Sequence, residues 1–244
     1  MPPPVASPTS HRAAAPPLEG AAWRAFLLTA GLVLAAWSVH NAFLLPWEES
    51  HLAAARREPV GLALRFVCWC LPAMAYLSRH DPRPIGVAWG LTSRVGLLRL
   101  LWQSPVAIGY LALAAVLASA SAPEGAAKPS LDSLVRLLAT IDCLWLLAGA
   151  MLEELLMRGF LLRQLLRRWS GGPAVLVVAL LFAAMHLPAW IAAGGMSISV
   201  AVSFVVLFMM GLVLGALTWA SGSLWPAIVV HFVNNALAAW LGAG

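Results

Sequence analysis

The sequence predicts an all-α integral membrane protein, a bundle of about seven to eight transmembrane helices with a polar site between them. Of its 244 residues, 61% are hydrophobic and only 10% are charged, whereas ordinary soluble domains carry about 25% charged residues. Apolar runs long enough to cross a bilayer recur along the chain. The composition therefore excludes an ordinary soluble domain and favours a polytopic membrane domain.

The first twenty residues differ from the rest of the chain. Residues 1–20 are rich in proline and alanine and poor in large apolar groups, so we expect a disordered tail before a membrane domain at 21–244. The apolar stretch after Trp23 is long and lacks a small-x-small cleavage site. It therefore predicts a retained first membrane helix rather than a signal peptide.

The membrane domain contains seven apolar segments of suitable length. Residues 85–101 could add an interfacial helix or part of an eighth span, since Arg94 and Arg99 interrupt their apolar character. The predicted spans are 24–45, 60–78, 103–121, 132–157, 173–190, 197–220 and 223–242.

The distribution of cations predicts the orientation. With seven spans, ten arginines, Arg158 and the basic run after it among them, fall on the side of the N-terminus, against Arg56, Arg57 and Lys128 on the other. Cytoplasmic loops carry the excess of Lys and Arg, so the N-terminus is expected in the cytoplasm. The net charge of +5 is explained in this way, and no nucleic-acid partner is expected.

Two adjacent carboxylates and an arginine stand at the end of a long apolar run, in Glu153-Glu154-Leu155-Leu156-Met157-Arg158-Gly159-Phe160. Ionisable groups inside a membrane are costly and mark functional sites. Glu154 and Arg158 are four residues apart and can pair on one helix face. Such a pair at a helix end could be purely structural, but it leaves Glu153 unexplained, because Glu153 points about 100° away around the helix.

The remaining polar candidates lie in a stretch without charge. From Ser170 to Gly244 there is no Asp, Glu, Lys or Arg, and the strongly polar side chains are His186, His231, Asn234 and Asn235. Each could simply join helices through hydrogen bonds. A carboxylate, two histidines and an amide are, however, also the groups needed to activate water and stabilise an oxyanion, provided that their helices converge.

The order Glu-Glu-x-x-x-Arg, Phe-x-x-x-His, His-x-x-x-Asn resembles the CPBP family of intramembrane endopeptidases. This family is also called the Abi or CAAX-protease family, and includes the type II CAAX prenyl endopeptidases and bacteriocin-immunity proteins. The three motifs begin at Glu153, Phe182 and His231, and the resemblance covers about residues 131–242. The first half of the chain is matched by its hydropathy alone.

The resemblance implies a glutamate-dependent peptidase. Glu153 would be the general base, helped by His186, while His231 and Asn235 would stabilise the oxyanion. Glu154 would hold the site together with its partner. The candidate catalytic residues are thus Glu153, Glu154, His186, His231 and Asn235, with Arg158 and Phe182 in support.

The need for a metal is left open by the sequence. Members of the family have also been described as metalloproteases, in which the histidines and a glutamate would bind zinc. The chain lacks the His-Glu-x-x-His spacing of the zincins, and no compact tetrahedral ligand set is evident. We favour a reaction without cofactor, and zinc remains possible.

The expected partners are the lipid bilayer and a membrane-anchored or lipid-modified protein substrate, cleaved near a CAAX-like or protein-sorting C-terminal tail. A cell-membrane location in a bacterium would suit the Ala/Leu/Arg-rich composition. One alternative is a non-catalytic immunity or scaffold protein of the Abi type. Another is a proton-coupled transporter, against which the lack of an internal repeat speaks.

Overall fold

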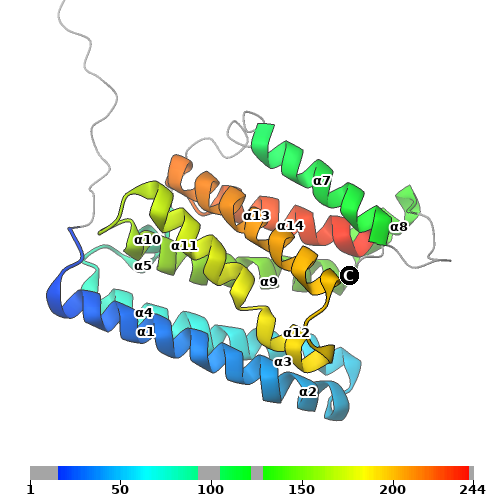
Figure 1. Ribbon diagram of the computed structural model, residues 1–244, viewed down its shortest axis with the longest axis horizontal. Helices are drawn as coiled ribbons and strands as arrows, with labels where there is room; N and C mark the ends of the chain where they lie inside the picture. Colours follow the sequence, from blue (N-terminus) through cyan, green and yellow to red (C-terminus); the bar gives the residue numbers. More distant parts are fainter. Residues whose placement is uncertain (1–15, 93–104, 122–128, 242–244) are drawn as a thin grey trace, which may run out of the picture.

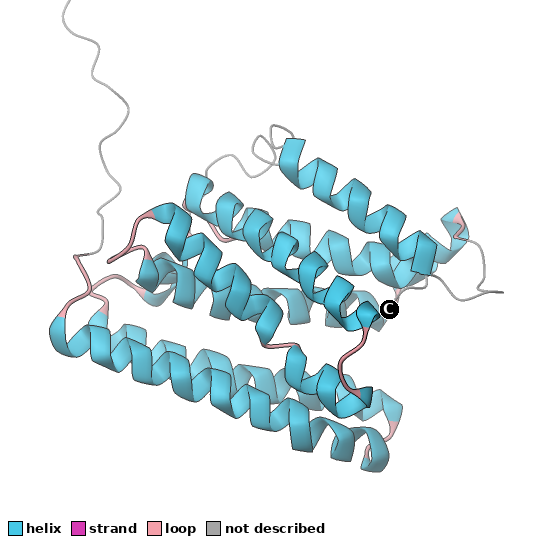
Figure 2. Ribbon diagram, in the orientation of Figure 1, coloured by secondary structure: helices cyan, strands magenta, loops and turns pink. Residues whose placement is uncertain are grey.

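The computed structural model describes residues 16–92, 105–121 and 129–241, and within these residues every regular element is a helix. Figure 2 shows helices joined by short loops. The predicted all-α class is therefore confirmed. The elements are α1 (Gly20–Val39), η1 (His40–Leu44), α2 (Leu45–His51), α3 (Ala54–Arg65), η2 (Phe66–Cys70), α4 (Leu71–His80), α5 (Ile85–Trp89), α7 (Pro105–Ser121), α8 (Leu131–Ala139), α9 (Ile141–Glu154), η3 (Leu155–Leu162), α10 (Arg163–Leu165), α11 (Gly171–Ala184), α12 (Leu187–Gly194), α13 (Ile198–Ser221) and α14 (Trp225–Trp240).

The long helices run roughly parallel to one axis of the molecule (Figure 1). Helix α1 packs along α4, and α3 packs against α9. Helix α14 contacts α9, α13 and α7, while α11 packs against α13 and η3. The segment α9–η3 therefore lies between the N-terminal helices and the C-terminal ones, and it carries the paired glutamates.

Four helices are long and apolar enough to cross a membrane: Gly20–His51, Arg56–His80, Gly171–Gly194 and Ile198–Ser221. A bent pair, Leu131–Ala139 with Asp142–Leu165, would be a fifth span, and Pro105–Ala120 is a shorter apolar helix. The chain is thus a multi-pass membrane protein. The count of seven to eight spans stays a prediction, and residues 93–104, which bear on the eighth, lie outside the described part.

One end of the bundle gathers arginines, and we call it the arginine end, defined by Arg79, Arg83, Arg163, Arg167 and Arg168. Helix ends from distant parts of the sequence meet here. The Leu18 N–H donates to the Arg167 carbonyl at 3.4 Å, Arg163 donates to the Gly222 carbonyl, and Trp225 Nε1 donates to the Leu91 carbonyl at 2.8 Å. These bonds join α1, α5, α10, α13 and α14 at the same end.

Asp81 organises the arginine end from a buried position just after α4. Arg83 donates to both of its carboxylate oxygens, from Nε at 2.9 Å and from Nη2 at 2.8 Å, and Arg167 Nη1 lies 3.6 Å from Oδ2. Burial alone would raise the pKa of Asp81, but the hydrogen bonds and charges of the two arginines outweigh it and hold this pKa below its ordinary value.

The expected N-terminal tail reaches the arginine end. Residues 1–15 lie outside the described part, but the Pro16 carbonyl accepts a hydrogen bond from Arg167 Nε at 2.9 Å, and Leu18 is fully buried. The chain from Pro16 onward therefore packs against the membrane domain rather than extending away from it.

Three π-helical segments, η1, η2 and η3, interrupt the long helices. A π segment shifts the direction of the side chains that follow it and is often found at functional sites. Here η1 holds Asn41, η2 begins directly after Arg65, and η3 begins directly after Glu154 and holds Arg158. Each therefore lies at a polar group in an otherwise apolar bundle.

Candidate active site

A buried ion pair forms the centre of the candidate site. Glu154 and Arg158 are both fully buried, and Arg158 Nη1 donates to Glu154 Oε1 at 2.7 Å. The same oxygen accepts a hydrogen bond from His231 Nδ1 at 2.9 Å. One carboxylate thus joins η3 to α14, and it fixes the proton of His231 on Nδ1.

Arg158 ties the pair to two further helices. Its Nη2 donates to the Gly211 carbonyl of α13 at 3.2 Å, and its guanidinium carbon lies 4.6 Å from the centre of the Phe182 ring on α11. In the sequence Arg158 was counted among the cations on the side of the N-terminus; its side chain is enclosed by the bundle, so it adds no exposed charge to a loop. Burial of this cation is tolerated because its charge is paired with Glu154 and its guanidinium lies near the Phe182 ring.

Close packing of α11 and α13 is a condition for these contacts. A Cβ atom on Gly211 would lie 2.8 Å from the Cα atom of Ala179, closer than real Cβ contacts allow. Small residues let membrane helices approach in this way. The approach brings the Gly211 carbonyl and the Phe182 ring to the same guanidinium.

Glu153 differs from its neighbour by facing a cavity. Its side chain is 16% exposed, against 0% for Glu154. The cavity, of about 510 Å³, is lined by residues of α3, α8, α9 and α14, including Arg65, Asn235 and Glu153. Around Glu153, His231 Nε2 lies 3.7 Å from Oε2 and Arg65 Nη1 lies 3.8 Å from Oε1. Glu153 is thus a carboxylate that water can reach, between two potential cations.

His186 lies at the end of α11, beside Phe182. Its Nδ1 donates to the Phe182 carbonyl at 2.9 Å, so a neutral His186 presents Nε2 as a proton acceptor. The Phe182 ring contacts both histidines edge-on, with ring centres 5.3 Å from His186 and 5.8 Å from His231. Phe182 therefore sets the spacing between the two imidazoles.

The turn that carries His186 is held from the N-terminal half of the chain. Asn41 Nδ2 donates to the Met185 carbonyl at 3.2 Å. Next to Asn41, His40 Nε2 lies 3.1 Å from Glu48 Oε1, and all three of these side chains are buried. A second buried polar cluster thus supports the backbone immediately before His186.

Asn235 reaches the cavity from α14 and belongs to a short chain of hydrogen bonds. The Tyr110 hydroxyl of α7 donates to Asn234 Oδ1 at 3.1 Å, and Asn234 Nδ2 donates to Asn235 Oδ1 at 3.2 Å. The Asn235 oxygen is occupied in this way, which leaves its amide N–H groups to act as donors.

Sequence reasoning missed three contributors, Arg65, Tyr110 and Asn41. All three lie in the N-terminal half, where no motif points to them. Arg65 could have been found by the criterion that singled out the glutamates, because it is a charged residue inside the predicted span 60–78. Asn41 and Tyr110 gave no comparable signal.

The described residues contain no group of three or more His, Cys, Asp or Glu side chains placed to hold a metal ion. Nδ1 of His186 and Nδ1 of His231 are both engaged by protein acceptors, so each imidazole has Nε2 left for chemistry. The cysteines described, Cys68, Cys70 and Cys143, are free thiols.

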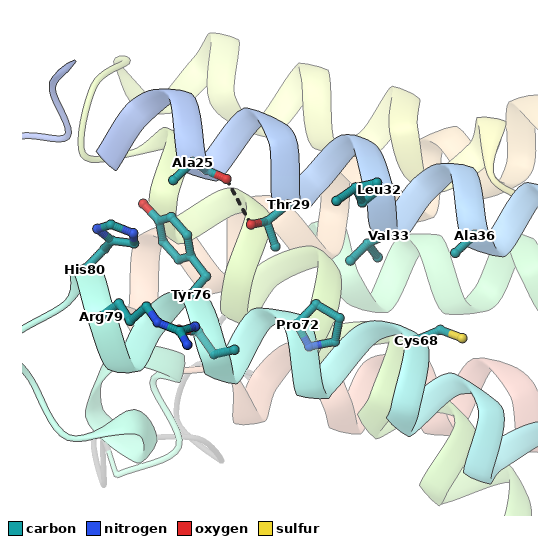
Figure 3. A pocket seen from close by; sticks show the side chains of 11 residues that line it. Ala25, Thr29, Leu32, Val33, Ala36, Cys68, Pro72, Tyr76, Arg79 and His80 are labelled. Atoms are coloured by element: carbon teal, nitrogen blue, oxygen red, sulfur yellow. Dashed lines mark hydrogen bonds between the residues drawn. The ribbon is translucent and has the colours of Figure 1, made fainter. Parts of the chain in front are cut away.

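A second cavity, of about 550 Å³, lies between α1 and α4 and is shown in Figure 3. Apolar side chains such as Leu32 and Val33 line it, with Arg79 and His80 at one end. The Thr29 hydroxyl donates to the Ala25 carbonyl within α1 at 2.9 Å. This cavity shares no lining residue with the cavity at Glu153, and no carboxylate lines it.

The chain thus combines helices that can cross a membrane with a buried Glu/Arg/His cluster and a second glutamate that faces a cavity. Such groups can take part in proton transfer. Residues 135–237 match the family described as type II CAAX prenyl endopeptidase Rce1-like, so this segment of the chain is similar to that protease family. The matched segment contains both glutamates, both histidines and Asn235. No curated protein and no solved structure matches the chain significantly.

Proposed function

We propose that this protein is an intramembrane glutamic endopeptidase that hydrolyses peptide bonds of membrane-anchored or lipid-modified proteins. The observation that carries the proposal is the difference between the paired glutamates. Glu154 is sealed in an ion pair, whereas Glu153 faces a cavity that also holds Asn235. Only Glu153 can meet water and a substrate, so it is the general base.

In the proposed reaction, the Glu153 carboxylate takes a proton from a water molecule as the water oxygen attacks the scissile carbonyl carbon. Nε2 of His186 is a second acceptor for the proton, because Nδ1 already donates to the Phe182 carbonyl. The proton then passes to the leaving amine as the C–N bond breaks. The roles follow from which atoms remain available after the protein's own hydrogen bonds are formed.

The oxyanion of the tetrahedral intermediate needs donors. The Asn235 amide supplies N–H groups, since its oxygen accepts from Asn234. His231 can donate from Nε2 only as an imidazolium, because Nδ1 already carries a proton toward Glu154. Glu154 therefore acts through His231, as the carboxylate of a catalytic triad orients its histidine.

We place the arginine end in the cytoplasm by the excess of cations there, which also puts the N-terminus on that side, in the plasma membrane of a bacterium. The cavity at Glu153 extends toward the other end, because its lining includes Glu58 in the N-terminal half of α3 and Asp142 in the first turn of α9. Asp142 precedes Glu153 by eleven residues, or about 16 Å along the helix. An extended peptide of about five residues would span this depth.

The end of the bundle toward which the cavity extends indicates which kind of substrate can reach Glu153. A cavity that opens away from the cytoplasm suits a C-terminal membrane anchor that is trimmed on the outer side, as in protein sorting. A prenylated CAAX tail made in the cytoplasm would have to approach from the arginine end. We therefore favour the sorting-type substrate within this family of proteases.

The proposal is tested by comparing membrane-protein C-termini in cells that carry the wild type or Glu153→Gln. Products found with the wild type and missing with the variant would identify the substrate. If the cellular phenotype survives both Glu153→Gln and His186→Ala, the protein is a non-catalytic scaffold. For the metal, activity of the purified enzyme should persist after prolonged chelation; loss on chelation with recovery on adding zinc would replace the glutamic mechanism with a metallopeptidase one.

A further inference from the structure

Arg65 is the last residue of α3, and its side chain lines the cavity. Its Nη1 lies 3.8 Å from Glu153 Oε1, and the side chain is 27% exposed. It is the one cation among the described residues that line this cavity, beside the carboxylates of Glu58, Asp142 and Glu153. It lies outside the segment 135–237 that matches the family.

The guanidinium makes no hydrogen bond to any described residue. The contact with Glu153 is longer than a hydrogen bond, and Arg65 Nε is buried with no acceptor. A guanidinium has several N–H donors in a planar fork that matches the geometry of a carboxylate. Buried donors without acceptors are costly, so this group is one that a ligand would complete.

The surroundings of Arg65 hold it in place. Its guanidinium carbon lies 5.6 Å from the Trp37 ring centre and 6.0 Å from that of Trp69. On the other side, a Cβ atom on Gly149 would come within 3.2 Å of Nη1, so this glycine leaves the space that the guanidinium occupies. An aromatic shelf on one side and a glycine on the other thus fix the direction of the donors.

We propose that Arg65 binds a carboxylate of the substrate peptide and thereby determines specificity. The inference rests on the proposed peptidase function and names a feature of its substrate. In the favoured sorting-type substrate this carboxylate is the side chain of an Asp or Glu, because the C-terminus lies beyond the membrane anchor; in a CAAX-like tail it is the C-terminus itself. Both present the same planar pair of oxygens to the guanidinium.

The distance between Arg65 and Glu153 limits where this carboxylate can be. A water molecule bound to Glu153 lies about 3 Å from the carboxylate and attacks the scissile carbon from about 3 Å. The substrate carboxylate would lie about 3 Å from the guanidinium. Added to the 3.8 Å between the two side chains, these contacts place the carboxylate within about 13 Å of the scissile carbon. At about 3.3 Å per extended residue, this is about four residues of peptide.

Glu58 and Asp142 make the site selective for a carboxylate carried by a peptide. Both line the cavity, and their negative charge opposes entry of a small free anion. A peptide that is held by contacts along the cavity can bring its carboxylate past them to Arg65. Acetate is therefore expected to inhibit poorly.

The test uses the full-length protein and a peptide copied from the cleavage site found by comparing wild type with Glu153→Gln. Three forms of this peptide are compared: unmodified, C-terminally amidated, and with nearby Asp or Glu changed to Asn or Gln. One of the two changes should lower kcat/KM of the wild type about 10- to 100-fold, mainly through KM, and it identifies the source of the carboxylate.

Arg65→Met should lower kcat/KM for the unmodified peptide by the same factor. The kcat/KM of this variant should then be the same for peptides with and without the carboxylate. Arg65→Lys, which keeps a charge beside Glu153, should recover part of the activity, and the exposed Arg56→Met on the same helix is the matched control. Melting temperatures show that the variants are folded.

If the wild type cleaves all three peptides equally well, or if Arg65→Met lowers kcat equally for all of them, Arg65 does not bind a substrate carboxylate and acts only on Glu153. That result would overturn this inference and leave the proposed function intact. If the wild type yields no product beyond those of Glu153→Gln, the proposed function fails and this inference with it.

Discussion

The Glu154 carboxylate lies 2.9 Å from Nδ1 of His231, across 77 residues of sequence. The same oxygen accepts from Arg158 at 2.7 Å. A buried arginine thus neutralises the carboxylate that orients an imidazole. In the proposed mechanism the two adjacent glutamates therefore have separate roles: Glu154 is committed to the structure, and Glu153 remains available for water.

Glu154→Gln should reduce both stability and activity. The change leaves the Arg158 charge buried without an anion, which costs about 3–5 kcal/mol, and it weakens the hold on His231. Thermal unfolding and kcat measure the two effects. In a double variant with Arg158→Met, stability should be partly recovered because no unpaired charge remains; a double variant less stable than both single variants would contradict the pairing as the cause.

Tyr110→Phe tests the hydrogen-bond chain from α7 to Asn235. Without the hydroxyl, Asn234 loses its donor, and the Asn235 amide is less firmly directed at the oxyanion. We expect kcat to fall about 5- to 20-fold, the equivalent of about 1–2 kcal/mol for a lost hydrogen bond, with little change in KM. The matched control is Asn235→Ala: adding Tyr110→Phe to it should cost nothing more, and an additive loss would show that Tyr110 acts elsewhere.

Gly211→Ala tests the close approach of α11 and α13. The added Cβ would meet the Ala179 backbone at 2.8 Å, so the helices must separate and the Arg158 bond to the Gly211 carbonyl is strained. We expect a loss of about 1–3 kcal/mol in stability and reduced activity. Gly31→Ala, where a Cβ atom meets nothing within 4 Å, should leave stability equal or slightly higher.

Asp81 should make stability depend on pH at the acidic end. Its folded pKa is lowered by Arg83 and Arg167, so its contribution is complete above the unfolded pKa of about 3.9 and is lost as the pH falls through the folded pKa. Asp81→Asn should therefore be less stable than the wild type at pH 7, and the difference should shrink as the pH falls below about 4. Melting temperatures of the wild type and Asp81→Asn at pH 7 and pH 3 measure this.

The control is Asp132→Asn at an exposed position, whose melting temperature should differ from that of the wild type equally at both pH values. If the melting temperatures of Asp81→Asn and the wild type differ as much at pH 3 as at pH 7, the account is contradicted.

The sequence was sufficient for the helical class, because hydropathy and spacing on a helix act locally. The roles of the motif side chains stay predictions. The sequence indicated that Glu153 and Glu154 point in different directions around their helix. In the structure the Glu153 side chain is partly exposed and the Glu154 side chain is fully buried. The contacts of Arg158 with α11 and α13 could not be foreseen, because a cation near a basic run resembles a loop residue until these partners are known. Arg65, Tyr110 and Asn41 depend on contacts between distant helices, which no local pattern records.

The number of spans illustrates the same limit. An apolar run predicts that a segment can enter a membrane, but α14 is 16 residues long and the segment around α8 and α9 bends by 68°. Whether such elements cross the bilayer depends on their neighbours and on the thickness of the surrounding lipid.

The most direct test of the central claim is the cleavage rate of purified Glu153→Gln in liposomes, measured beside its melting temperature. The amide cannot accept the proton of the attacking water, so the rate should fall by at least about 10²–10⁴-fold while the melting temperature stays within a few degrees of the wild type. A folded Glu153→Gln protein that cleaves within a few-fold of the wild-type rate would contradict the assignment of Glu153 as the base.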